Sequence, residues 1–111
     1  MAFDPKPEPK PTPDVRATWG IIVEERSERT QLPLQQRYVF GSTAVRGLFA
    51  DGKFLCVDRN STDPGVKPYI DQAAKLGVPC LILTDDAGNI AFQGPLPGSV
   101  DETVKLIGGK K

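Results

Sequence analysis

Few side chains in this sequence could perform covalent or metal chemistry. The chain has 111 residues, two cysteines (Cys56 and Cys80) and no histidine. It therefore lacks the commonest metal ligand and the commonest general base near neutral pH. Two cysteines cannot make a four-cysteine zinc site, and these two lie too far apart in the sequence to be a closely spaced redox pair. We expect no metal or other cofactor, and single-thiol chemistry is the catalytic possibility that remains.

The two cysteines differ in their surroundings. Cys56 is in the middle of the apolar segment 53–58, where a cysteine usually packs as a small hydrophobic residue. Cys80 directly follows Pro79, and two interpretations of its position are open. An exposed Cys80 near a helix N-terminus would have a stabilised thiolate and could react, whereas a Cys80 that points into the core would be inert. Cys80 is thus the candidate catalytic residue.

The segment 24–30, "EERSERT", concentrates charged and hydroxyl side chains. Arg26 and Arg29 could each donate paired hydrogen bonds to a carboxylate or a phosphate. The glutamates beside them disfavour strong phosphate binding. Ser27 is a poor nucleophile because the chain has no histidine to act as its base, and we expect Ser27 or Thr30 to cap the first helix instead.

The composition is typical of a globular domain. Lysine and arginine number 14, as do aspartate and glutamate, so no net positive field favours nucleic acid. No run of 18 apolar residues predicts a membrane span, and the N-terminal sequence lacks the apolar core of a signal peptide. We expect a cytoplasmic protein, although an exported or anchored protein whose leader had been removed would read the same.

The chain divides into a tail and one domain. Proline occupies every second position from 5 to 13, a pattern that favours an extended polyproline conformation and cannot join a sheet interior. We therefore expect residues 1–16 to form a tail, either a solvated spacer or an arm that docks on a partner. Residues 17–109 are expected to form the domain, and residues 110–111 a frayed end.

The order of predicted elements is strand, helix, strand, helix, strand, strand, helix. This order predicts an α/β domain with a four-stranded mixed sheet, about three helices and helices on both faces of the sheet. The strands are expected over 18–25, 53–58, 78–84 and 90–93, and the helices over 31–50, 66–76 and 100–107.

The segment 31–50 is ambiguous. Its apolar spacing fits a helix that is broken near Gly41, with Ser42 capping the second half. Alternatively, "RYVF" (37–40) reads as a strand and "FADGKF" (49–54) as a hairpin, which would give a more β-rich domain of unknown role.

Two segments resemble the thioredoxin-like superfamily. "KLGVPCLILTDDAGNIAFQG" (75–94) is similar to the family's helix end, Val-Pro step, apolar strand, acidic-Gly turn and edge strand. "GPLPGSVDETVKLI" (94–107) resembles its following loop and last helix. The resemblance covers 53–107 well and 19–50 loosely, and it implies a minimal thioredoxin fold without the additional N-terminal strand and helix.

The resemblance also implies roles for particular residues. Pro79 would follow a cis peptide bond, and the backbone of Val78 would face a bound peptide that pairs with it as an added strand. The position of the family's Cys-x-x-Cys motif is occupied here by "SERT", Ser27 to Thr30, so the disulfide chemistry is lost. The implied binding residues are Arg26, Ser27, Arg29, Thr30, Val78, Pro79 and Cys80.

Two functional hypotheses follow. The first is a redox-inactive thioredoxin-like module that engages a protein partner through this surface and the proline-rich tail. The alternative is a single-cysteine thiol enzyme or redox sensor that uses Cys80, which requires an exposed Cys80 with a lowered pKa. The sequence names neither the partner nor the oligomeric state.

Overall fold

The computed structural model describes residues 15–111, so the predicted tail lies almost entirely outside the described residues. A four-stranded sheet has the order β2-β1-β3-β4. β1 is parallel to β2 and antiparallel to β3, and β3 is antiparallel to β4, so the predicted mixed sheet is confirmed. The strands are β1 (Trp19–Glu24), β2 (Phe54–Asp58), β3 (Cys80–Thr84) and β4 (Ile90–Pro95). The helices are the 3-10 helix η1 (Arg26–Gln31) and the α-helices α1 (Leu34–Phe40), α2 (Thr43–Arg46), α3 (Lys67–Leu76) and α4 (Val100–Gly108).

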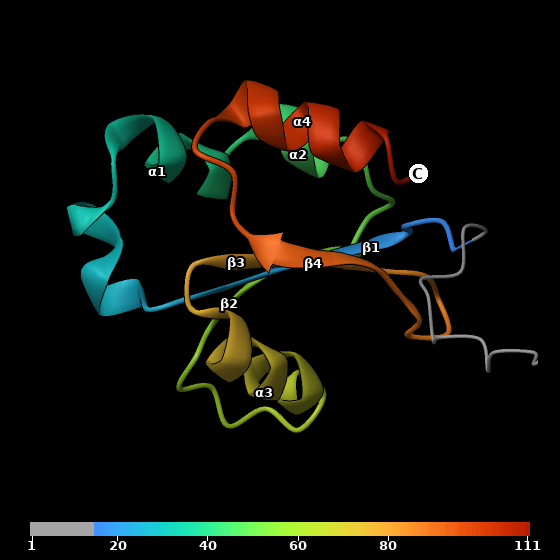
Figure 1. Cartoon of the computed structure of the whole chain (residues 1–111), viewed down its shortest axis with the longest axis horizontal. Coiled ribbons are helices and arrows are strands. Elements are labelled where there is room, and N and C mark those ends of the chain that lie inside the picture. Colours follow the sequence, from blue (N-terminus) through green and yellow to red (C-terminus); the bar gives the residue numbers. More distant parts are fainter. Residues whose placement is uncertain (1–14) are drawn as a thin grey trace, which may run out of the picture.

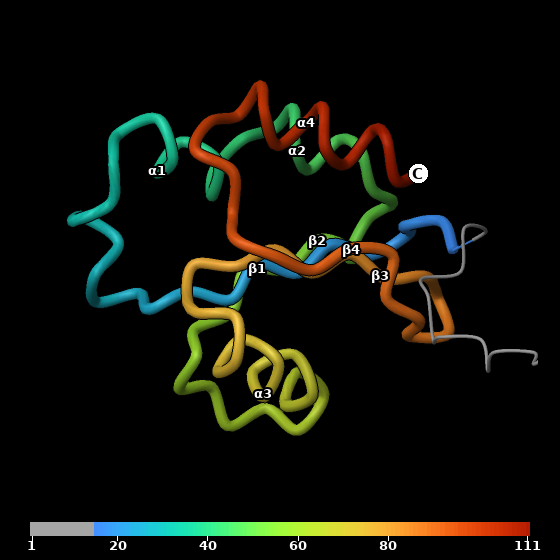
Figure 2. Tube along the Cα trace, in the orientation of Figure 1, coloured from blue at the N-terminus to red at the C-terminus, as the bar shows by residue number. Residues whose placement is uncertain are grey.

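Helices cover both faces of the sheet. In Figures 1 and 2, α3 lies on one face, and α1, α2 and α4 lie on the other. Successive side chains of a strand point to opposite faces. Ile21 and Val23 of β1 therefore pack in the core on the α3 side, whereas Ile22 between them packs in the core beneath α1, α2 and α4. This two-sided burial explains why the centre of β1 is continuously apolar.

The ambiguous segment between β1 and β2 is helical. α1 ends at Phe40, and α2 begins after Ser42, whose hydroxyl oxygen accepts a hydrogen bond from the Val45 amide at 3.2 Å. Phe40 and Val45 are buried in the same core. This burial favours the helical conformation and outweighs the β-propensity of residues 37–40. The helix broken near Gly41 is therefore confirmed, and the hairpin alternative is wrong.

The two later helices begin and end where local signals predict. α3 stops at Gly77, whose positive φ of 87° suits glycine. The hydroxyl oxygen of Ser99 accepts a hydrogen bond from the Glu102 amide at 3.2 Å and caps α4. Within residues 15–111, none of these helices has the length and apolar character needed to cross a membrane.

Candidate protein-binding surface at the end of β1

Two segments that are distant in sequence meet where β1 ends. Val23 of β1 pairs with Cys80 of β3 in the antiparallel ladder. The chain that leaves β1 into η1 therefore lies beside the chain that enters β3, at one end of the sheet (Figure 1). Together they line a hollow of about 30 Å³, with walls from Glu24, Glu25, Glu28, Leu32, Val78 and Pro79. We call Val78, Pro79 and residues 25–32 the Val78 surface.

The backbone of Val78 is the unusual feature of this surface. The Val78–Pro79 peptide is cis, so that prediction from the resemblance is confirmed. The Pro79 carbonyl accepts a hydrogen bond from the Leu96 amide at 3.1 Å. Within residues 15–111, by contrast, no backbone hydrogen bond uses the N–H or the C=O of Val78. An unpaired donor and acceptor at the entry to a strand are groups that an extended peptide can pair with.

A buried ion pair holds η1 against the domain. The carboxylate of Glu24 is 1% exposed and accepts hydrogen bonds from Arg29, at 2.8 Å from Nε and also from Nη2. The hydrogen bond to Glu24 raises the pKa of Arg29. The guanidinium also lies 4.4 Å over the ring centroid of Phe40. Arg29 is therefore used internally, and of the two predicted arginines it is not the one available to a ligand.

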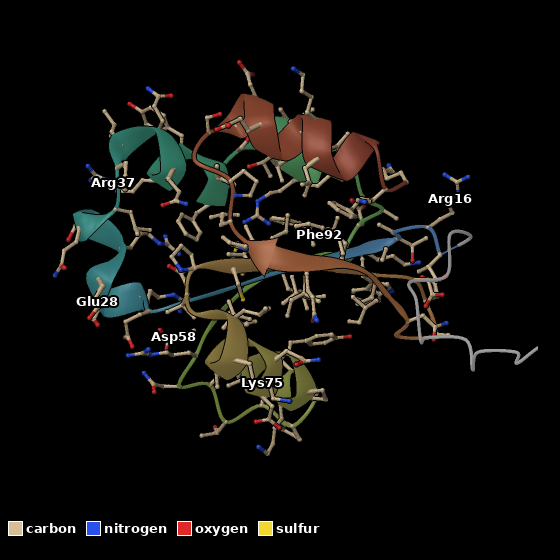
Figure 3. All side chains as sticks on the ribbon, in the orientation of Figure 1. Arg16, Glu28, Arg37, Asp58, Lys75 and Phe92 are labelled. Carbon is tan, nitrogen blue, oxygen red and sulfur yellow. The ribbon has the colours of Figure 1, made fainter. Side chains whose placement is uncertain are left out.

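Arg26 points outward and is available. Its side chain is 60% exposed, and its Nε is 3.9 Å from the Glu24 carboxylate. Its backbone amide donates to Asp58 at 2.7 Å, and this bond, with one from the Asn60 amide, lowers the pKa of Asp58. Figure 3 shows Asp58 and Glu28 at the same end of the molecule.

The hydroxyl residues of "SERT" do not cap a helix, so that prediction is wrong. The residue before η1 is Glu25 and the residue before α1 is Pro33, and neither end has a side-chain capping bond. Ser27 lies inside η1 and not before it, and its hydroxyl donates a charge-assisted hydrogen bond to the Glu25 carboxylate at 2.8 Å. This bond, followed by one from Arg59, lowers the pKa of Glu25. Thr30 is exposed.

Cys80 is not part of the exposed surface. Its side chain is fully buried on the α3 side of the sheet, against Ala73 and Ile82, and burial raises the pKa of its thiol. The exposed, activated thiol that the alternative hypothesis requires is therefore not present at Cys80. Cys56 is half-buried on the opposite side of the sheet, and burial raises the pKa of its thiol too. Both cysteines are free.

Sequence reasoning missed the buried carboxylate of Glu24. The signal was present, since alternation along β1 puts Glu24 on the same face as the buried Ile22. A carboxylate at such a position needs a cationic partner, and Arg26 and Arg29 were the near candidates. Which of the two would pair with it depends on the path of η1, and the sequence does not contain that information.

Comparisons with known proteins identify no relative that could assign a role to this surface. No family model, no curated protein and no solved structure matches the chain. Within the part of the chain that the structure describes, no three histidine, cysteine, aspartate or glutamate side chains are grouped so that they could hold a metal ion.

Proposed function

We propose that this protein is a thioredoxin-like binding module without redox activity, which engages a protein partner through the Val78 surface. The unpaired backbone of Val78 beside the hollow carries the proposal. A partner segment in extended conformation would pair with this backbone, and one of its side chains would pack over the mouth of the hollow. Main-chain pairing of this kind supplies affinity without a reactive group on either side.

The side chains around the hollow indicate which segment would fit. Leu32 supplies an apolar wall, and Glu28 is exposed. Glu24 and Glu25 are already neutralised by Arg29 and Arg59. We therefore infer a partner segment that combines an apolar side chain with a basic one, which would lie near Glu28.

The absence of redox activity rests on the residues at the expected reactive position. Ser27 and Thr30 carry hydroxyls, and disulfide exchange requires a thiolate. The fully buried thiol of Cys80 cannot take over this role from inside the core. The same loss of chemistry leaves binding as the use of the surface.

A peptide selection followed by NMR tests the proposal. Peptides would be selected from a random displayed library against the full chain, and a synthetic copy of an enriched peptide titrated into ¹⁵N-labelled protein. We expect the largest amide shifts at Val78 and in η1. Glu28→Gln should weaken binding by about threefold to tenfold, as expected for loss of one rim charge. Asp63→Asn, at the opposite end of the sheet, should leave binding unchanged. Shifts concentrated away from the Val78 surface would refute the proposal.

The tail requires a separate experiment, since it is proposed as a second contact with the same partner. Deletion of residues 1–14 should change the thermal midpoint by less than about 2 °C, because the buried cores lie within residues 15–111. The deletion should abolish or strongly reduce binding of the intact partner protein once the selected sequence has identified it. Undiminished binding would mean that the tail is a spacer.

A further inference from the structure

A larger cleft lies at the opposite end of the sheet from the Val78 surface. Residues of the turn that joins β3 to β4 and residues at the start of α3 line it, and its volume of about 470 Å³ is within the usual range for ligand sites. Figure 1 shows these two segments at the same end of the sheet. The lining of the cleft includes two aromatic residues, Trp19 and Tyr69, and three aspartates, Asp63, Asp85 and Asp86. We call it the Trp19 cleft.

The charged residues that line the Trp19 cleft are all aspartates. Asp85 is used within its own turn, where its carboxylate accepts hydrogen bonds from the Ala87 and Asn89 amides at 2.9 and 2.8 Å. Asp63 and Asp86 are exposed residues on two separate segments. A cleft with this lining attracts a positively charged group and repels an anion.

Both exposed aspartates retain an oxygen with accepting capacity. Asp86 accepts hydrogen bonds from Thr18, Trp19 and Lys53 at 2.7, 3.1 and 3.0 Å, and all three reach the same oxygen, Oδ1. Asp63 accepts a hydrogen bond from the Gly65 amide at 2.8 Å, again through Oδ1. Among residues 15–111, no hydrogen bond reaches Oδ2 of either residue.

Lys53 pairs with one of the aspartates of this cleft. Its ammonium pairs with Oδ1 of Asp86 and lies 5.7 Å from the centroid of the Trp19 ring. It leaves Asp63 without a cationic partner among the described residues. The Trp19 ring therefore already has one cation within cation–π distance.

Aromatic walls select among positively charged groups. Trp19 and Tyr69 both border the cleft, and the bond from the indole N–H to Asp86 fixes the Trp19 ring. A planar guanidinium can stack on an aromatic ring and donate paired hydrogen bonds to a carboxylate at the same time, which an ammonium does less well. A metal ion could neither stack on the rings nor donate hydrogen bonds to the carboxylates.

We propose that the Trp19 cleft binds an arginine side chain of a partner protein, through stacking on its aromatic walls and pairing with Asp63 and Asp86. The free carboxylate oxygens are on exposed residues of two surface segments, so a side chain can enter from solvent. A small free ligand would need to be enclosed over most of its surface. This site is separate from the Val78 surface, and each can fail without the other.

The single tryptophan of the chain makes the test direct, because Trp19 lies in the cleft. The probe is a capped Gly-Arg-Gly peptide, titrated into the full chain while Trp19 fluorescence is recorded. We expect a saturable change with a dissociation constant of about 1 mM, the scale for one stacked and ion-paired side chain. The same peptide with citrulline, an uncharged isostere of arginine, should bind at least about tenfold more weakly. Citrulline binding equal to arginine binding, or no saturation, would overturn the proposal.

Two substitutions locate the binding. Asp63→Asn retains an oxygen for the Gly65 amide and should weaken the arginine peptide by about fivefold to tenfold. Asp86→Asn should weaken it similarly, with calorimetry replacing fluorescence if the signal of Trp19 itself changes. Asp101→Asn, at an exposed carboxylate in the first turn of α4, is the matched control and should leave the affinity unchanged. An unchanged affinity in folded Asp63→Asn would place the peptide elsewhere and overturn the proposal.

Discussion

The two ends of the sheet differ in which polar groups lack a partner within the protein. At the Val78 surface, Glu24 pairs with Arg29 and Glu25 pairs with Arg59, so these charges are neutralised within the protein. The backbone N–H and C=O of Val78, by contrast, are unpaired. In the Trp19 cleft the backbone is not the open feature, and the side chains carry carboxylate oxygens without donors. The first end therefore suits recognition of a main chain, and the second suits recognition of a side chain.

The comparison depends most on the buried pair of Glu24 and Arg29. Glu24 is 1% exposed, whereas the Arg29 side chain is 35% exposed. Arg29→Met would leave a buried carboxylate without its partner and should lower the free energy of unfolding by about 3 kcal/mol, the low end of the range because water reaches Arg29. Glu24→Gln should cost less, since the freed guanidinium can turn toward solvent. Urea denaturation measures both.

The matched control for that pair is Arg26→Ala. The Arg26 side chain is 60% exposed and only 3.9 Å from the same carboxylate at its nearest atom, so its loss should cost less than about 0.5 kcal/mol. A double variant, Glu24→Leu with Arg29→Met, should recover most of the loss, because it leaves no unpaired buried charge. If Arg26→Ala proved as costly as Arg29→Met, the two arginines would share the carboxylate and Arg26 would not be free for a partner.

The second prediction concerns the thiol beside the Val78 surface. In a Cys56→Ala variant, alkylation of native Cys80 should be at least about a hundredfold slower than alkylation of the unfolded chain, because its fully buried thiol reacts only on opening. Burial raises the pKa of the folded Cys80 thiol, so the native state supplies no activated thiolate, and labelling should not accelerate below the ordinary thiol range. Iodoacetamide labelling followed by mass spectrometry measures this rate. Rapid labelling in the native state would instead support a thiol enzyme or redox sensor that uses Cys80.

The smallest effect is expected at the Trp19 cleft, as the pH falls. Hydrogen bonds from Thr18, then Lys53, lower the pKa of Asp86 below its ordinary value of 3.8. A carboxylate whose pKa is lower in the folded state stabilises the fold at any pH above its pKa in the unfolded chain. This contribution is lost as the pH falls through its pKa in the folded state. Asp86→Asn should therefore reduce the dependence of stability on pH below about pH 4.

Thr18→Val tests the assigned cause, since it removes the donor with the largest effect on the Asp86 carboxylate. It should reproduce part of the change seen with Asp86→Asn. Thermal unfolding followed at several acidic pH values measures both variants. If the pH dependence of stability were unaltered in Asp86→Asn, these donors would not favour the ionised form of Asp86. The hydrogen bonds in the cleft would then contribute less to stability than the pairing of Glu24 with Arg29.

Much of the architecture was predictable because its signals are local. The stop of α3 at Gly77 and the caps at Ser42 and Ser99 each depend on groups within three or four residues of one another. The apolar runs that became β1 and β3 needed only their composition to be recognised. Where the local signals conflicted, as over 37–40, burial of Val39 and Phe40 in the shared core decided for helix.

The sequence by itself determined the four strands, the helices α3 and α4, the order of these elements and the absence of a dithiol. Only the tertiary structure decided that Cys80 faces α3, that Arg29 rather than Arg26 neutralises Glu24, and that Asp63 and Asp86 share one cleft with Trp19. The reason is geometric. A shift of one residue in strand register reverses which side chains face the core, and contacts between distant segments depend on that register and on the packing of every helix.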